Sequence, residues 1–205
     1  MSARVFEELT NNYGLDPIII INKHNFQSYE DYLENLKICD RSTIDSLYEE
    51  ASYRSLDNQA NEGFFLVDEE NNDYLSCVVQ YNCDNLIAKN LLNQNDLQRF
   101  KNKSCEILLL CSNKTNKIKG LAFDFMEHLK TYLAQKGIQY IFLVVSNLKN
   151  DDDYRVAFYN SLGFDLMNNS LMIYTSQIAG KIKKRKTRRR RKNKKRILSK
   201  RKRHH

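Results

Sequence analysis

Apolar residues along the chain form short continuous runs, separated by stretches in which they recur at helical spacing. Two runs, "CEILLLC" (105–111) and "IQYIFLVV" (138–145), are apolar almost throughout, as expected of strands that are covered on both faces. Between them, apolar residues recur every three or four positions from Leu121 to Leu133, and Gly137 follows where a helix would end. A strand, a helix and a strand of these lengths predict two parallel strands joined by a right-handed crossover.

The part of the chain before this unit predicts three strands and two helices. The run "IIIIN" (18–22) indicates a buried first strand. "GFFLV" (63–67) and "YLSCVVQY" (74–81) flank the polar run "DEENND", which predicts an antiparallel hairpin. Apolar residues at helical spacing predict helices in the intervening segments 28–40 and 42–54.

The remaining segments give weaker patterns. Residues 82–103 are polar and rich in Asn, and predict at most a short helix around "NDLQRF" (95–100). "DDYRVAFYNSLG" (152–163) begins with acids and ends with glycine, as a helix does. "FDLMN" (164–168) and "LMIYTSQI" (171–178) predict two closing strands. The predicted order is β-α-α-β-β-β-α-β-α-β-β.

Charge divides the 205 residues into two parts. From Lys181 to the end there are 17 Lys and Arg and no Asp or Glu, so residues 1–180 hold 16 basic and 25 acidic residues, a net charge of −9. We therefore predict an acidic α/β domain over 1–180 and a disordered Lys/Arg-rich tail over 181–205. No run approaches the ~18 apolar residues of a membrane span, so we expect no membrane partner.

The five cysteines predict reduced thiols in an intracellular protein. They are odd in number and lie mostly within apolar runs. Their spacing lacks the close pairs of a zinc knuckle, and we expect no metal. They are Cys39, Cys77, Cys83, Cys105 and Cys111.

Residues 112–122, between the first long apolar run and the helix, are the candidate phosphate-binding loop. They contain neither the Gly-Lys-Ser/Thr of a P-loop nor the three glycines of a dinucleotide fingerprint. What remains is Lys117-x-x-Gly120-x-Ala122 at the helix start, where small residues would let a diphosphate reach unpaired N–H groups. Taken alone, one glycine here fits an ordinary helix start as well as an anion site.

Two motifs in order resemble those of the GNAT superfamily of N-acetyltransferases. Lys117-x-x-Gly120-x-Ala122 resembles the family's Arg/Gln-x-x-Gly-x-Gly/Ala acyl-CoA motif, and "AFYNSLGF" (157–164) resembles its Ala-x-x-Phe-Tyr-x-x-x-Gly-Phe signature, with Ala157 displaced by two places. The resemblance covers about residues 17–177. It implies a mixed, mainly antiparallel sheet with helices on both faces, whose central parallel strands splay to form an acyl-CoA cleft.

The resemblance also implies a cofactor site and its residues. Acetyl-CoA would act as co-substrate, with its pantetheine in the gap between 108–112 and 143–147 and its diphosphate on the glycine loop. The implied cofactor-binding residues are Leu109, Leu110, Cys111, Lys117, Ile118, Lys119, Gly120, Leu121, Ala122, Asn147 and Tyr159.

Direct transfer of the acetyl group to an amine needs a base and an acid. Glu106 and Asp73 are the candidate bases by topology, and the resemblance makes Tyr159 the general acid. The family's CoA-contacting Asn would fall near Tyr154 or Arg155, and neither matches it. The alternative function is therefore a catalytically degenerate acetyltransferase scaffold that binds or packages nucleic acid.

The basic tail predicts a polyanion partner. Such a run binds phosphates by releasing counterions, and its lack of aromatic residues argues against base stacking. It would attach the protein to nucleic acid, direct it to the nucleus or nucleolus, or itself be acetylated. The acceptor amine would be a lysine of a basic protein or a polyamine. The abundance of Asn, Lys and Ile hints at an AT-rich genome, such as that of a large DNA virus. In that case we expect the protein in the virion. The predicted contacts are Lys183, Lys184, Arg185, Lys186, Arg188, Arg189, Arg190, Arg191 and Lys192.

Overall fold

The computed structural model describes residues 4–29, 61–67, 73–112, 118–145, 152–168 and 170–176. The helices predicted for 28–40 and 42–54 lie outside these ranges, apart from Ser28 and Tyr29, and so does the basic tail.

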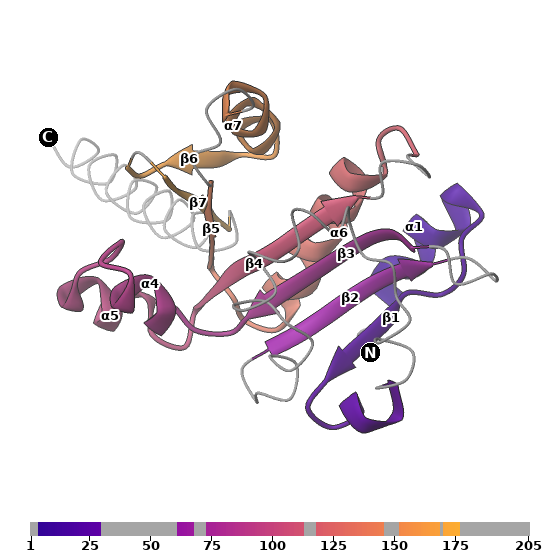
Figure 1. Ribbon diagram of the computed structural model, residues 1–205, viewed down its shortest axis with the longest axis horizontal. Helices are drawn as coiled ribbons and strands as arrows, with labels where there is room; N and C mark the ends of the chain where they lie inside the picture. Colours follow the sequence, from indigo (N-terminus) through magenta and orange to yellow (C-terminus); the bar gives the residue numbers. More distant parts are fainter. Residues whose placement is uncertain are drawn as a thin grey trace, which may run out of the picture.

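Seven strands form one mixed sheet in the order β1-β2-β3-β4-β5-β7-β6 (Figure 1). β4 and β5 are parallel, and every other neighbouring pair is antiparallel, which confirms the predicted fold class. The strands are β1 (Ile19–Asn22), β2 (Asn61–Val67), β3 (Asp73–Gln80), β4 (Ser104–Ser112), β5 (Tyr140–Val144), β6 (Phe164–Leu166) and β7 (Leu171–Thr175).

The helices lie where the apolar pattern predicts, with two additions. The predicted helices are α6 (Leu121–Gln135), α7 (Asp152–Ser161) and the short α5 (Gln94–Phe100). The additions are α4 (Asp84–Ala88) and α1 (Arg4–Tyr13). A 3-10 turn, Phe26–Tyr29, follows β1.

The main core lies on the face of the sheet that α6 covers. Alternate residues of the strands point to this face, as the period of two requires, and Cys105 and Ile107 of β4 are examples. α1 packs beside α6, and Figure 1 shows α6 passing behind β3 and β4. The ring of Phe6 on α1 lies 5.8 Å from that of Phe125 and 5.6 Å from that of Tyr132, both on α6.

The opposite face carries smaller clusters. Leu86 of α4 and Phe100 of α5 pack against Phe142 of β5 and Leu171 of β7, so these two short helices cover the β5–β7 part of the sheet. In Figure 1 they lie at one end of the molecule, next to the beginning of β4. None of the described helices has the length and apolar character that crossing a membrane requires.

Candidate functional site

β4 extends well beyond its pairing with the parallel strand β5. β4 pairs with β5 only from Ser104 to Ile107, whereas its pairing with β3 continues to Ser112. Beyond Ile107, no described strand pairs with the edge of β4 that faces β5. β5 itself ends at Val144, and residues 146–147 of the gap that the resemblance predicts lie outside the described residues.

A β-bulge marks the point of separation. Val79 pairs with Ile107 and Val78 with Leu109, so Leu108 is an extra residue in β4. Leu108 and Leu109 consequently both pack with the small cluster on the face opposite α6, while Leu110 packs against the main core. A bulge bends its strand and increases the local twist, and this one lies where the pairing of β4 with β5 ends.

The beginning of α6 has the backbone geometry of an open anion site. Gly120 is the N-cap residue and adopts φ +88°, a left-handed conformation that favours glycine, and no side chain caps the helix. Leu121 N donates to Ile118 O at 3.3 Å, but within the described residues the N–H groups of Ala122 and Phe123 have no partner. These groups stand at the positive end of the helix dipole.

Tyr159 lies on α7 on the same side of the sheet as α6. Its ring contacts those of Phe158 and Phe164, with centroid distances of 5.2 and 5.7 Å, and it packs against the main core. Burial raises the pKa of Tyr159 to about 12, with a further increase from Cys77 and a decrease from Arg155. Cys77 belongs to the main core against which Tyr159 packs, so the ring lies on the sheet side of α7.

Glu106 lies on the other side of the sheet. It is 2% exposed, and Asn85 Nδ2 of α4 donates to its Oε2 at 3.4 Å. The two predicted catalytic residues therefore lie on opposite faces of the sheet, and Glu106 is within the stretch of β4 that pairs with β5. Asp73, the second candidate base, pairs through its backbone with Val67 at a hairpin bulge, and its side chain lies outside the description.

The other predicted cofactor residues fall into three groups. Leu109, Leu110 and Cys111 form the separated part of β4. Leu121 is buried and Ile118 and Ala122 are half-buried, so these three would contact a ligand through the backbone, whereas Lys119 and Gly120 are exposed. Lys117, Asn147 and all nine tail residues lie outside the described ranges.

The cysteines correct one expectation. Cys77, Cys83 and Cys105 are free and buried, as predicted, but Cys111 is disulfide-bonded, with a partner outside the described residues. Cys111 comes after the bulge, near the partly exposed end of β4, where its sulfur is not enclosed by the main core. In the described ranges, no three His, Cys, Asp or Glu side chains gather as metal ligands would.

Sequence reasoning missed the contribution of α1 to this region. Tyr13 Oη donates to Asp124 Oδ2 at 2.7 Å. A Cβ added at Gly120 would lie 3.1 Å from Tyr13 Oη. The sequence signal for α1 is the amphipathic pattern of residues 4–13, in which Phe6 and Leu9 are buried. We did not assign these residues to a helix from the sequence.

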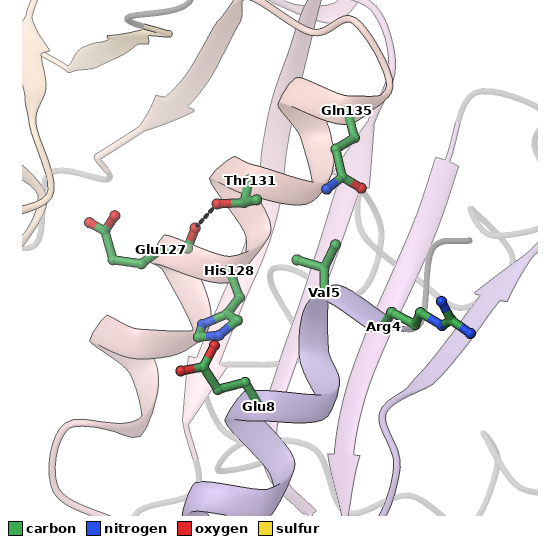
Figure 2. A pocket seen from close by; sticks show the side chains of 7 residues that line it. All are labelled: Arg4, Val5, Glu8, Glu127, His128, Thr131 and Gln135. Atoms are coloured by element: carbon green, nitrogen blue, oxygen red, sulfur yellow. Dashed lines mark hydrogen bonds between the residues drawn. The ribbon is translucent and has the colours of Figure 1, made fainter.

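A groove also follows the seam between α1 and α6, on their outer side (Figure 2). Its volume is about 730 Å³, and no predicted site residue lines it. The lining residues are Arg4, Val5, Glu8, Glu127, His128, Thr131 and Gln135.

Comparisons with known proteins agree with the topology. No protein-family profile and no curated protein sequence matches the chain. Among solved structures, it is similar to the GNAT domain of S. lividans PAT, with 8% identity, a TM-score of 0.53 and coverage of 78% of this chain and 89% of that one. It is also similar to Tetrahymena GCN5, with 12% identity, a TM-score of 0.50 and coverage of 78% and 96%.

A third similar structure is the KacTA–DNA complex, with 18% identity, a TM-score of 0.53 and coverage of 80% of this chain and 97% of that one. At these identities the similarity concerns the fold. The chain has the fold of the GNAT acetyltransferases.

Proposed function

We propose that the protein is an acetyl-CoA-dependent N-acetyltransferase. The observation that carries the proposal is the combination of two features in one unit: the stretch of β4 after Ile107 that no longer pairs with β5, and the uncapped, left-handed Gly120 at the start of the connecting helix. The first offers a slot to an extended pantetheine chain, and the second offers N–H groups to a diphosphate.

The diphosphate would be bound mainly by the backbone. The unpaired N–H groups of Ala122 and Phe123 act as donors, and Lys119 adds exposed positive charge beside them. Hydrogen bonds to a charged group contribute about 1.5–3 kcal/mol each, so a few of them suffice for micromolar affinity. Lys117 precedes this turn in the sequence and belongs to the same proposed site.

The reacting thioester would lie in the slot beside Leu109–Cys111. There, backbone groups on the edge of β4 that faces β5 would bind pantetheine and donate to the acetyl carbonyl oxygen as it becomes negative. Asn147 follows the end of β5 in the sequence, and we place it on the other wall of the slot.

The chemistry needs one proton removed and one supplied. An alkylammonium acceptor with a pKa of about 10.4 costs about 4.6 kcal/mol to deprotonate at pH 7, and we assign Glu106 to accept this proton, directly or through water. The amine nitrogen then attacks the carbonyl carbon and the carbon–sulfur bond breaks. Tyr159 gives its proton to the departing thiolate, and because its pKa is about 12, its hydroxyl is protonated at neutral pH.

The acceptor would be a cationic amine. Residues 1–180 carry a net charge of −9, which attracts a lysine-rich protein segment or a polyamine. We further propose that the tail from Lys183 to Lys192 attaches the enzyme to nucleic acid and directs it to the nucleus, which would bring it close to basic proteins.

The test is transfer of labelled acetyl groups from acetyl-CoA to three acceptors: spermidine, a lysine-rich peptide and the protein's own tail. We expect turnover with at least one of them, and a loss of at least tenfold in kcat in Tyr159→Phe and in Glu106→Gln. Tyr140→Phe is the matched control, because that tyrosine packs on Phe100 away from the gap. Tight binding of acetyl-CoA without transfer to any acceptor would favour the degenerate scaffold instead.

A further inference from the structure

The N-terminal helix contributes one polar side chain to the start of α6. α1 and α6 run antiparallel, so that Tyr13, at the end of α1, meets the first turn of α6, while Phe6 meets Tyr132 near its other end. The Tyr13 hydroxyl donates to Asp124 Oδ2 at 2.7 Å. The same hydroxyl would lie 3.1 Å from a Cβ at Gly120, so it borders the turn that is proposed to bind the diphosphate.

Asp124 is a potential competitor for that turn. Residues four apart lie one above the other on a helix, and side chains tilt toward the helix N-terminus, so the Asp124 carboxylate is directed toward Gly120. A carboxylate at this end of a helix is stabilised by the dipole and accepts hydrogen bonds from unpaired N–H groups. These are the interactions that a diphosphate would use, and two anions on one turn repel each other.

The hydrogen bond from Tyr13 fixes the position of this carboxylate. It engages Oδ2 from the α1 side, where Tyr13 is packed against the main core. The hydrogen bond to Asp124, together with burial, raises the pKa of the phenol above 10, so the hydroxyl carries its proton at physiological pH. Asp124 therefore accepts a hydrogen bond from a permanently protonated donor on α1.

We propose that Tyr13 is a positioning residue of the coenzyme site, which holds the Asp124 carboxylate against α1 and leaves the first-turn N–H groups of α6 open to the diphosphate. The inference rests on the proposed function, because it assumes that acetyl-CoA binds at this turn. It assigns to the N-terminal helix a role in ligand binding in addition to its packing on α6.

A double-mutant cycle on acetyl-CoA affinity tests the proposal by calorimetry on the full chain. Tyr13→Phe keeps the ring and removes the donor. We expect the Kd of this variant for acetyl-CoA to rise on the order of fivefold. Asp124→Asn removes the competing charge, and we expect its Kd to equal or fall below that of the wild type. In the Asp124→Asn background, adding Tyr13→Phe should leave the Kd unchanged.

The outcomes separate this inference from the proposed function. If the wild type binds acetyl-CoA and Tyr13→Phe binds it equally well, the role of Tyr13 is wrong and the function stands. If Tyr13→Phe weakens binding by the same factor with and without Asp124→Asn, Tyr13 acts only through packing, which also overturns the proposal. If the wild type shows no saturable binding, both fall. Thermal unfolding of all four proteins checks that each is folded at the titration temperature.

Discussion

Within the proposed site, Tyr159 is a residue whose pKa is raised well above that of an exposed tyrosine. Tyr159 is half-buried, its ring packs against Phe158, Phe164 and the main core, and burial raises its pKa to about 12. Between pH 10 and pH 12 the unfolded chain loses this proton while the folded protein keeps it. The contribution to stability is therefore complete below pH 10 and is lost as the pH rises toward 12.

We predict a difference in alkaline stability between the wild type and Tyr159→Phe. From pH 9 to pH 11.5 the wild type should lose about 2 kcal/mol more of its free energy of unfolding, at about 1.36 kcal/mol per pKa unit. Urea unfolding at the two pH values measures this, and the other tyrosines cancel because both proteins contain them. Parallel losses would mean that the phenol is exposed.

At the scale of single residues, the sequence suggested candidate site residues through local motifs. It did not suggest residues that reach the proposed site only through tertiary packing. Gly120 and Tyr159 were predicted because each lies in a short motif at the start or within a helix. Tyr13 lies 107 positions before Gly120, and only the packing of α1 on α6 brings the two together. Nothing in residues 4–13 alone indicates which helix they would contact.

Lys130 connects α6 to the end of α7. This α6 residue is only 8% exposed, and its Nζ donates to Leu162 O, at the end of α7, at 2.8 Å. It also pairs with Glu127 and lies 4.7 Å from the centroid of the Tyr174 ring on β7. The bond to Leu162 fixes the end of the helix that carries Tyr159.

We predict that Lys130→Met lowers the free energy of unfolding by about 2 kcal/mol, because the Leu162 carbonyl would lose its charged donor. Urea unfolding compares it with Lys101→Met, a change at an exposed position after α5. Equal stabilities of the two variants would contradict the assignment of Lys130 as a connection between α6 and α7.

Helices and strands were predictable where one spacing of apolar residues persisted over many positions. β4, α6 and β5 were correctly predicted because continuous apolar runs flank a long stretch of helical spacing. The bulge at Leu108 was not, since every residue of "CEILLLC" is apolar except Glu106 and an extra residue changes no pattern. α4 was missed because its five residues are too few to show a helical period, and their position depends on packing of Leu86 against the sheet.

For the whole molecule, the separation of charge is the dominant feature. The sequence joins a segment of net charge −9 to 25 residues that carry 17 basic side chains. We predict that removing 181–205 abolishes binding to duplex DNA or RNA in a mobility-shift assay. The intact protein should bind more weakly at higher salt, with a log–log slope of roughly −0.9 per neutralised phosphate. Unchanged affinity after truncation would show that the tail is not the attachment site.

The most direct measurement of the central claim is a calorimetric titration of acetyl-CoA into the wild type, Gly120→Ala and Gly137→Ala. The two glycines have similar φ angles, +88° and +86°, at opposite ends of α6, so both substitutions introduce comparable backbone strain. Only the first adds a methyl group at the proposed diphosphate site, where it would lie 3.1 Å from Tyr13 Oη, whereas a Cβ at Gly137 has nothing within 4 Å. The account predicts micromolar binding by the wild type and by Gly137→Ala, and at least tenfold weaker binding by Gly120→Ala. No binding by the wild type, or equal binding by all three proteins, would contradict it.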